Sequence, residues 1–306
     1  MASWQARLAV QIVKWRVKRK LLGVRDYRVA RKILRPDPYT VPATVRVSPS
    51  KVGGVPGEWV EAIQTNSNAN PVLLYLHGGG YFACSAESHR AITVSFAREG
   101  FKVLAPDYRL APEDQFPAAV DDAVAAYRGL LSGGHSPERI VVGGDSAGGG
   151  LAVALLLALR EAGVRLPSGA ALFSPWTDLA ATGESIRTNA DRCAMFHGPS
   201  IGYSARYYLG EADPRTPLAS PLYADLTGLP PLLIHVGADE ILLDDSTRLA
   251  ERARAAGVKT ELKIWPVVPH AWQLAAGKIP EARQSLRESA AFLLALLSQE
   301  PPGKVA

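Results

Sequence analysis

The chain has 306 residues, of which 47% are hydrophobic, and a net charge of +5, so it is long enough to bury one large core. Its two cysteines, Cys84 and Cys193, are too few for a disulfide framework and lack the spacing of zinc sites, which favours a reducing, cytoplasmic location. No apolar run is long enough for a membrane span and no signal-peptide pattern opens the chain, so we expect neither, nor a nucleic-acid partner.

The N-terminal arm, residues 1–40, is strongly basic. Residues 1–35 hold eleven Lys and Arg against one acid, Asp26, a charge of +10 that leaves −5 for the rest of the chain. An amphipathic helical pattern runs along the arm through Trp4, Leu8, Ile12 and Trp15. Either this stripe packs on the main domain and the basic face is solvated, or the helix contacts an anionic membrane peripherally. We favour packing, because an exposed stripe with two tryptophans lowers solubility.

Beyond the arm, β-prone and helical segments alternate. The expected strands are 43–47, 58–63, 72–77, 101–106, 139–144, 170–175, 231–237 and 261–266. The expected helices are 86–99, 117–131, 147–162, 243–256 and 280–298. This alternation predicts an α/β fold over residues 41–306, with a mostly parallel central sheet covered by helices on both faces.

A serine stands in a glycine cluster between the third apolar strand and the helix that follows it. Residues 144–148 read GDSAG, the G-x-S-x-G pattern in which small neighbours allow a sharp turn that exposes Ser146 at the carboxyl edge of the sheet. The glycines do not fit a phosphate loop, because no lysine follows Gly148, or a dinucleotide loop, because the G-x-G-x-x-G spacing is absent. A plain glycine turn is the remaining structural alternative.

A nucleophilic serine needs a base, and the base needs an acid that orients it. His270 follows the last strand in a Pro-containing loop at the same edge of the sheet. Asp239 comes two residues after the strand 231–237, and Glu240 is its nearest rival. The chain order Ser146, Asp239, His270 is that of α/β-hydrolases.

The first buried strand ends in the motif HGGG, residues 77–80. Glycines there let backbone N–H groups approach a substrate with no side chain between, and together with the N–H of Ala147 they would hold an oxyanion. Because HGGG and GDSAG occur together after successive strands, a bare glycine turn is a poor explanation of the pair.

These motifs make the chain resemble the hormone-sensitive-lipase-like family of α/β-hydrolase carboxylesterases. The matching stretches are LYLHGGGYF (74–82), DYRLAPEDQFPAAVDD (107–122), GGDSAGG (143–149), GADEILLDD (237–245) and PHAW (269–272). A departure is Ala83-Cys84, where the family often has a further glycine, and this leaves the pocket wall open.

The resemblance implies Ser146 as nucleophile, His270 as base and Asp239 as the orienting acid. It also implies oxyanion donors at Gly78, Gly79 and Ala147, and a lid formed by the N-terminal helices with a contribution from about 177–228. It favours a lid role for the basic arm.

The expected activity is hydrolysis of short- to medium-chain carboxylic esters through an acyl-enzyme, with a small-molecule ester as substrate and no metal or organic cofactor. Bulky residues near the motifs are expected to line the substrate pocket: Tyr81, Phe82, Met195, Phe196 and Trp272. A lactone hydrolase or an amide-cleaving enzyme could use the same residues, and a non-catalytic small-molecule receptor could use the same fold. The oligomeric state cannot be read from the sequence.

Overall fold

The strand Val72–Leu76 (β3) shows how the sequence builds the core, since all five of its residues are buried. Side chains of a strand alternate between the two faces of the sheet. Leu74 and Leu76 accordingly belong to one apolar cluster, while Leu73 and Tyr75 belong to a second cluster on the opposite face. A strand apolar on both faces therefore lies at the centre of a sheet that helices cover on both sides.

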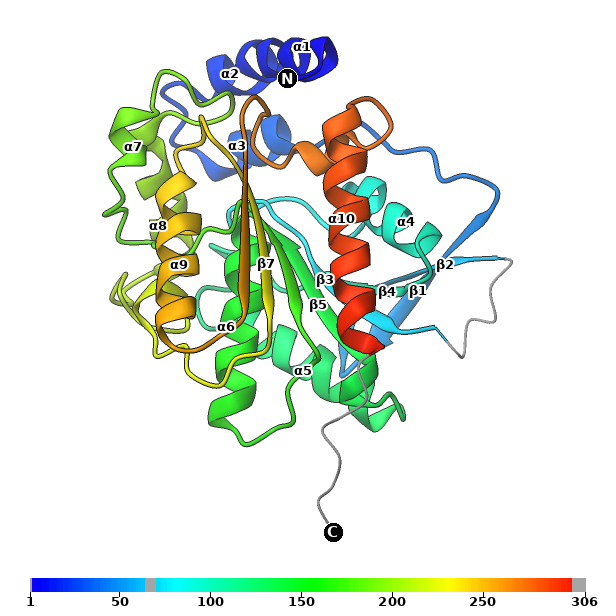
Figure 1. The fold of residues 1–306 in the computed structure, drawn as a ribbon. Coiled ribbons are helices and arrows are strands. Elements are labelled where there is room, and N and C mark those ends of the chain that lie inside the picture. Colours follow the sequence, from blue (N-terminus) through cyan, green and yellow to red (C-terminus); the bar gives the residue numbers. More distant parts are fainter. Residues whose placement is uncertain (1, 64–69, 299–306) are drawn as a thin grey trace.

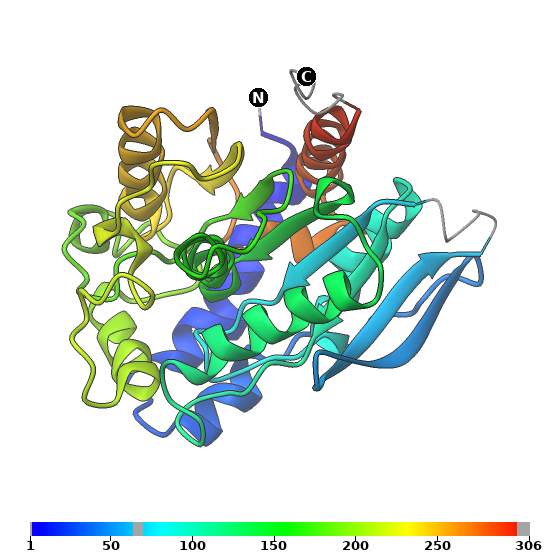
Figure 2. The same cartoon turned by 90° about the horizontal axis from the view of Figure 1, so that it is seen from below.

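The computed structural model, which describes residues 2–63 and 70–298, confirms the predicted fold class (Figures 1 and 2). Its sheet has eight strands in the order β1-β2-β4-β3-β5-β6-β7-β8. Strand β2 pairs antiparallel with both β1 and β4, and all the remaining neighbouring strands pair parallel. The strand bounds are β1 Val45–Val52, β2 Val55–Ala62, β4 Lys102–Pro106, β5 Ile140–Asp145, β6 Ala170–Phe173, β7 Leu232–Gly237 and β8 Thr260–Trp265.

Two groups of helices cover the sheet. Helices α5, α6 and α9 pack on the face of Leu74, and α4 and α10 pack on the face of Leu73. The helix bounds are α1 Trp4–Val13, α2 Arg19–Leu21, α3 Tyr27–Leu34, α4 Arg90–Arg98, α5 Ala118–Ser132, α6 Ala147–Glu161, α7 Ser185–Thr188, α8 Ile201–Leu209, α9 Leu243–Ala255 and α10 Pro280–Leu297. Most expected elements begin and end within a residue or two of these bounds.

The first two strands are longer than expected and form one hairpin. The turn is Gly53-Gly54, and both glycines have positive φ angles, +61° and +85°. Such two-residue turns match the twist of the flanking strands. A side chain at Gly53 would also lie 1.9 Å from the carbonyl oxygen of Ala125 in α5. The hairpin turn is thus held tightly against a helix of the core.

The arm packs on the main domain, but the prediction of which face it buries is wrong. Ala6 of α1 is fully buried against a cluster that includes Trp265 and Trp272. The predicted apolar stripe faces outward, with exposed fractions of 69% for Trp4, 50% for Leu8, 45% for Ile12 and 64% for Trp15. At this contact the large side chains, Trp265 and Trp272, belong to the main domain, so α1 packs against them with the small side chain of Ala6.

Polar contacts fix the rotation of the arm. The N–H and hydroxyl of Ser3 donate to the carboxylate of Glu281 at the start of α10, at 2.6 and 2.8 Å. Farther along, the ammonium of Lys18 donates to the backbone carbonyls of Ala190 and Cys193, at 2.6 and 2.9 Å. One lysine of the predicted solvated face is therefore turned inward.

A buried acid joins α9 to the segment after β6. The carboxylate of Asp245 accepts hydrogen bonds from the N–H groups of Thr177 and Asp178, at 2.8 and 2.9 Å. Burial raises the pKa of Asp245 to about 8. In the unfolded chain an aspartate has a pKa of about 3.9, so between the two values the folded protein holds one proton more.

This difference predicts a stability that falls with pH. The contribution of Asp245 is fully present below about pH 4 and is lost as pH rises through the folded pKa of about 8. Between about pH 5 and pH 8, Asp245→Asn should therefore flatten the decline in the free energy of unfolding by up to about 1.4 kcal/mol per pH unit. Denaturant unfolding at several pH values measures this. Asp225→Asn is the control, because hydrogen bonds to Thr227 lower the pKa of Asp225 and place its effect below this range. Parallel declines in wild type and Asp245→Asn would contradict the prediction.

Candidate active site

Ser146 lies at the sharp turn between β5 and α6, in a backbone conformation that side chains rarely adopt (φ +53°, ψ −123°). Its N–H donates to the carbonyl of Phe173 at 2.8 Å. Two glycines make the turn possible. A side chain at Gly144 would lie 2.3 Å from the carbonyl oxygen of Gly148, and one at Gly148 would lie 2.1 Å from that of Leu76. The strand and the helix thus approach closely and present the serine at the sheet edge.

His270 is held by a carboxylate, but that carboxylate is not Asp239. The Nδ1 atom of His270 lies 2.5 Å from an oxygen of Glu240, and both side chains are buried. The second oxygen of Glu240 accepts from the hydroxyl of Ser174 at 2.6 Å and from the N–H of Gly237 at 2.7 Å. The loop after β7 thus turns back toward its own strand and carries Glu240 inward.

The prediction of Asp239 as the orienting acid is therefore wrong. The turn that brings Glu240 inward sends Asp239 outward, where its carboxylate lies 3.2 Å from Arg192 and the side chain is 42% exposed. Both carboxylates follow the same strand, and both are candidates for the orienting acid from the sequence. Only the course of the turn decides which one reaches His270.

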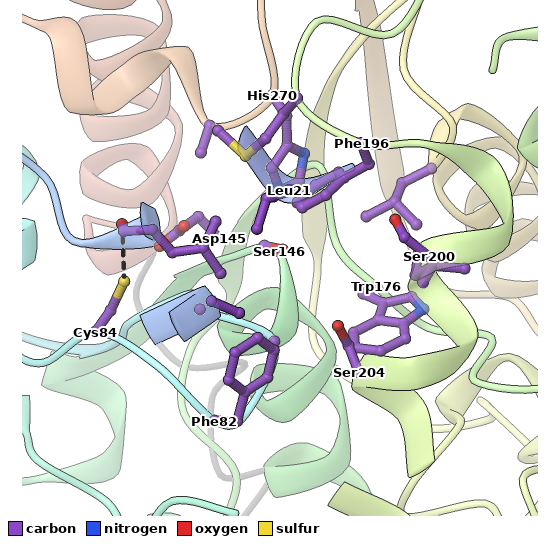
Figure 3. A pocket seen from close by; sticks show the side chains of 18 of the residues that line it. Leu21, Phe82, Cys84, Asp145, Ser146, Trp176, Phe196, Ser200, Ser204 and His270 are labelled. Atoms are coloured by element: carbon purple, nitrogen blue, oxygen red, sulfur yellow. Dashed lines mark hydrogen bonds between the residues drawn. The ribbon is translucent and has the colours of Figure 1, made fainter. Parts of the chain in front are cut away.

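Ser146 and His270 line the same cavity (Figure 3). The Nε2 atom of His270 is buried and has no hydrogen-bond partner within the described part of the chain. Since Nδ1 contacts a carboxylate, Nδ1 carries the proton when the ring is neutral and Nε2 is the free acceptor. A buried polar atom without a partner is unusual, and here it belongs to the base expected beside Ser146.

The oxyanion donors expected from the HGGG motif need one correction. The N–H of Gly78 donates to the carboxylate of Asp145 at 3.0 Å, so it is already used inside the protein. Gly79 and Gly80 line the cavity instead, and neither N–H has an acceptor among the described residues. Ala147 is the first residue of α6, where a backbone N–H has no partner within the helix. The available donors are thus Gly79, Gly80 and Ala147.

Asp145 connects the serine turn to the glycine loop. Besides the N–H of Gly78, its carboxylate accepts the hydroxyl of Tyr75 at 2.8 Å and lies 3.3 Å from the Nε2 atom of His89. Burial alone would raise the pKa of Asp145, but His89 and these hydrogen bonds hold it below its ordinary value. A side chain at Gly78 would lie 2.2 Å from this carboxylate, which explains the glycine there.

The cavity encloses about 110 Å³ and has a largely apolar wall. Three of the five predicted pocket residues line it: Phe82, Met195 and Phe196. The other two do not, because Tyr81 stacks on Tyr208 at a centroid distance of 3.8 Å and Trp272 packs on Trp265. The main contributors that the sequence analysis missed are Leu21, Val24, Ala30 and Leu34 of the arm, with Trp176 and Leu242.

Cys84 and His77, which could in principle serve as a second nucleophile and a second base, do not compete with Ser146 and His270. Cys84 lines the cavity, but burial raises the pKa of its thiol to about 12, so it stays protonated. Burial lowers the pKa of His77 to about 3, and Tyr108 stacks on its ring. Within the described ranges, no group of three or more His, Cys, Asp or Glu side chains is placed to hold a metal ion.

The stretch DYRLAPE, residues 107–113, holds the loops around the cavity. The hydroxyl of Tyr108 donates to the carbonyl of His77 at 2.6 Å. Glu113 accepts from the guanidinium of Arg31, which also donates to the carbonyl of Ala111 at 2.8 Å. The last two contacts attach helix α3 of the arm to the cavity rim.

Comparison with known proteins gives a consistent result. A family model described as an alpha/beta hydrolase fold matches residues 73–274. An acetyl-hydrolase from Streptomyces hygroscopicus is 46% identical over 79% of this chain and 80% of that protein. An esterase from Acinetobacter venetianus is 38% identical over 83% of each chain.

Solved structures agree. A crystal structure of an esterase/lipase from an uncultured bacterium has a TM-score of 0.92 and 39% identity, covering 97% of this chain and all (100%) of that one. An esterase from the bacterial hormone-sensitive lipase family has a TM-score of 0.90 and 42% identity, with coverage of 97% and 100%.

Because the backbone contact at Gly148 is so close, even the methyl group of an alanine there should destabilise the fold. Gly148→Ala would place a Cβ atom 2.1 Å from the carbonyl oxygen of Leu76, so it should destabilise the fold by about 1–3 kcal/mol. Gly202→Ala is the matched control, since Gly202 also lies in a helix but has open space around it. That change should stabilise by about 0.5–1 kcal/mol, as alanine does in helices. Denaturant unfolding measures both, and equal effects at the two glycines would argue against the contact.

Proposed function

Because the chain belongs to the α/β-hydrolase family, in its hormone-sensitive-lipase-like branch, we propose that it is a carboxylesterase that uses Ser146 as nucleophile. One observation carries the proposal. The Nε2 atom of His270 is buried at the cavity that Ser146 lines and has no hydrogen-bond partner among the described residues, while Nδ1 is held by Glu240. A base fixed in this way can take the hydroxyl proton of the serine.

The reaction then follows two similar halves. His270 takes the proton from Ser146 as the serine oxygen attacks the ester carbonyl, and the carbonyl oxygen becomes an oxyanion. The alcohol leaves with the proton from His270, and the acyl group stays on Ser146. Water, deprotonated by the same His270, attacks the acyl-enzyme, and the carboxylic acid is released.

Glu240 and the glycine loop support the two charges that develop. The carboxylate of Glu240 stabilises the imidazolium that forms when His270 takes the proton. The N–H groups of Gly79, Gly80 and Ala147 are the oxyanion donors, because none of the three has an acceptor among the described residues and two of these residues lie on the cavity wall. Asp145 fixes this loop through Gly78.

The substrates are esters with short to medium acyl chains. The cavity of about 110 Å³ is smaller than the roughly 150 Å³ that encloses a benzene ring in an engineered cavity. Its apolar wall suits an alkyl group. The name of one relative, an acetyl-hydrolase, agrees with a small acyl group.

The arm, residues 1–40, acts as a cap over this cavity, with a contribution from about 177–228. Leu21, Val24 and Leu34 line the cavity from the arm, and Met195 and Phe196 line it from the second segment. Peripheral membrane contact concerns the outer face of the same arm and is a separate proposal. The low cysteine content continues to favour the cytoplasm.

The first functional prediction separates the two neighbouring carboxylates. Ser146→Ala and His270→Ala should each lower kcat for p-nitrophenyl butyrate on the order of 10³-fold or more. Glu240→Gln should cost on the order of 10²- to 10⁴-fold, because the base loses its orienting charge. Asp239→Asn is the control and should stay within about twofold, since its side chain points outward to Arg192. Circular dichroism shows whether each variant is folded. A larger loss in Asp239→Asn than in folded Glu240→Gln would restore Asp239 as the acid.

The second prediction tests the cap. Two adjacent leucines face opposite directions, since Leu21 lines the cavity and Leu22 is 66% exposed. Leu21→Ala should enlarge the acyl site and move the kcat/KM optimum from the butyrate or hexanoate ester toward the decanoate ester, by about tenfold in their ratio. Leu22→Ala should leave the ratio unchanged on these water-soluble esters. The same chain-length profile in Leu21→Ala and wild type would mean that the arm is not a wall of the acyl site.

A further inference from the structure

The outer surface of the arm carries most of the large exposed apolar side chains of the described residues. Of nine such side chains, six belong to the arm: Trp4, Leu8, Ile12, Trp15, Leu22 and Val29. The first four follow one another at helical spacing, so they form a continuous stripe. We call these four residues the outer stripe. Soluble proteins keep such patches small unless the patch binds something.

The outer stripe cannot turn inward, because the opposite side of the helix is already bound. Ala6 is fully buried against the cluster of Trp265 and Trp272, and Ser3 is tied to Glu281. The ammonium of Lys18 is held by backbone carbonyls one turn beyond the stripe. The apolar surface is thus a permanent outward feature of the fold.

Positive charges border the outer stripe. Arg7, Arg16 and Arg19 lie three or four residues after Trp4, Ile12 and Trp15, so each is on the neighbouring helix surface, and all three are exposed. Arg16 pairs with Asp37, whereas Arg7 and Arg19 have no ion pair within the described part of the chain. Residues 1–35 of the arm carry +10 against −5 for the remaining chain.

We propose that the outer stripe, which runs along α1 and continues to Trp15 in the π-helical segment Lys14–Lys18, docks the protein together with its basic border on an anionic lipid surface. Interfacial helices combine an apolar face that enters the headgroup region with Lys and Arg that attract acidic lipids, and tryptophan prefers this depth. None of the helices in the described residues is long and apolar enough to cross a bilayer. The contact is therefore peripheral.

Charge decides between lipid and a second copy of the chain. Pairing two outer stripes about a two-fold axis would bring together two N-terminal segments whose residues 1–35 each carry +10, and like charges across an interface oppose binding. An acidic membrane carries the opposite charge over its whole surface, and each Lys or Arg near it adds about 1 kcal/mol of attraction. The same cations that disfavour self-association thus favour lipid.

Docking also places the cavity near the lipid. Leu21 lines the cavity with Ser146, as Figure 3 shows, and Leu22 is exposed on the outer side. At this point two adjacent residues of the chain thus face the cavity and the solvent. A docked protein would hold the cavity against the membrane and take up esters that partition there.

Vesicle binding tests the proposal with the full chain and without substrate. Flotation compares vesicles of phosphatidylglycerol and phosphatidylcholine in equal parts with vesicles of phosphatidylcholine alone. Wild type should bind the acidic vesicles at least tenfold more tightly, and about 1 M salt should remove most of this difference. Similar binding to both vesicles, or to neither, would overturn the proposal.

Paired variants show which residues bind. Trp4→Ser with Trp15→Ser should weaken binding at least tenfold, while Ile264→Ser with Leu294→Ser, which changes exposed apolar residues elsewhere, should not. Arg7→Gln with Arg19→Gln should also weaken binding at least tenfold, while Arg98→Gln with Lys51→Gln, the same charge change elsewhere, should not. All four double variants should retain wild-type kinetics on soluble esters, which separates failed docking from a failed esterase.

The oligomeric state tests whether a second copy of the chain, rather than lipid, covers the outer stripe. Sedimentation velocity should give the same monomeric or oligomeric state for wild type and the Trp4→Ser, Trp15→Ser variant. If wild type self-associates and this variant does not, the outer stripe is an interface between copies and the lipid proposal is wrong. Variants that bind acidic vesicles as wild type does would also reject it.

Discussion

The backbone contact between α6 and β3 is the constraint on which the active site depends. Gly148 lies so close to the carbonyl of Leu76 that no side chain fits, and this closeness brings the serine turn beside the loop that follows β3. The chain then needs a conformation at Ser146 that is costly for any residue with a side chain. The surrounding sheet, buried on both faces, offsets that cost.

Asp145 fixes the position of the serine turn relative to the glycine loop after β3. Its carboxylate receives the N–H of Gly78 and the hydroxyl of Tyr75, so the nucleophile turn and the glycine loop share one buried anion. Using the Gly78 N–H internally removes it as an oxyanion donor, and it orients the next two glycines toward the cavity. The loop is thus preorganised before any substrate binds, as electrostatic stabilisation of an oxyanion requires.

The sequence was sufficient to predict the fold and to place Ser146 and the loop of His270 at one edge of the sheet, because these follow from periodicity and from residues at strand ends. It could not decide between Asp239 and Glu240, which are adjacent in a short turn. A strand alternates its side chains regularly, but a turn does not, so the facing of each residue depends on its dihedral angles. Here Glu240 is turned back to the N–H of Gly237 and its neighbour faces solvent. The same limit applies to Gly78, whose N–H is used by a partner 67 residues away in the chain.

The arm shows a different limit of pattern reading. A hydrophobic stripe predicts the buried face of a helix when the helix contributes the large apolar side chains of the contact. Here the domain supplies them, with Trp265 and Trp272, and the helix fits with Ala6. The larger side chains of the helix are then left outside, next to Arg7 and Arg19, which have no ion pair among the described residues. The two uses belong to different segments of the arm: α1 packs on the domain through Ala6 and leaves its large apolar residues outside, whereas Leu21 and Leu34, farther along the arm, line the cavity. Enclosing the cavity and binding lipid are therefore compatible uses of one arm.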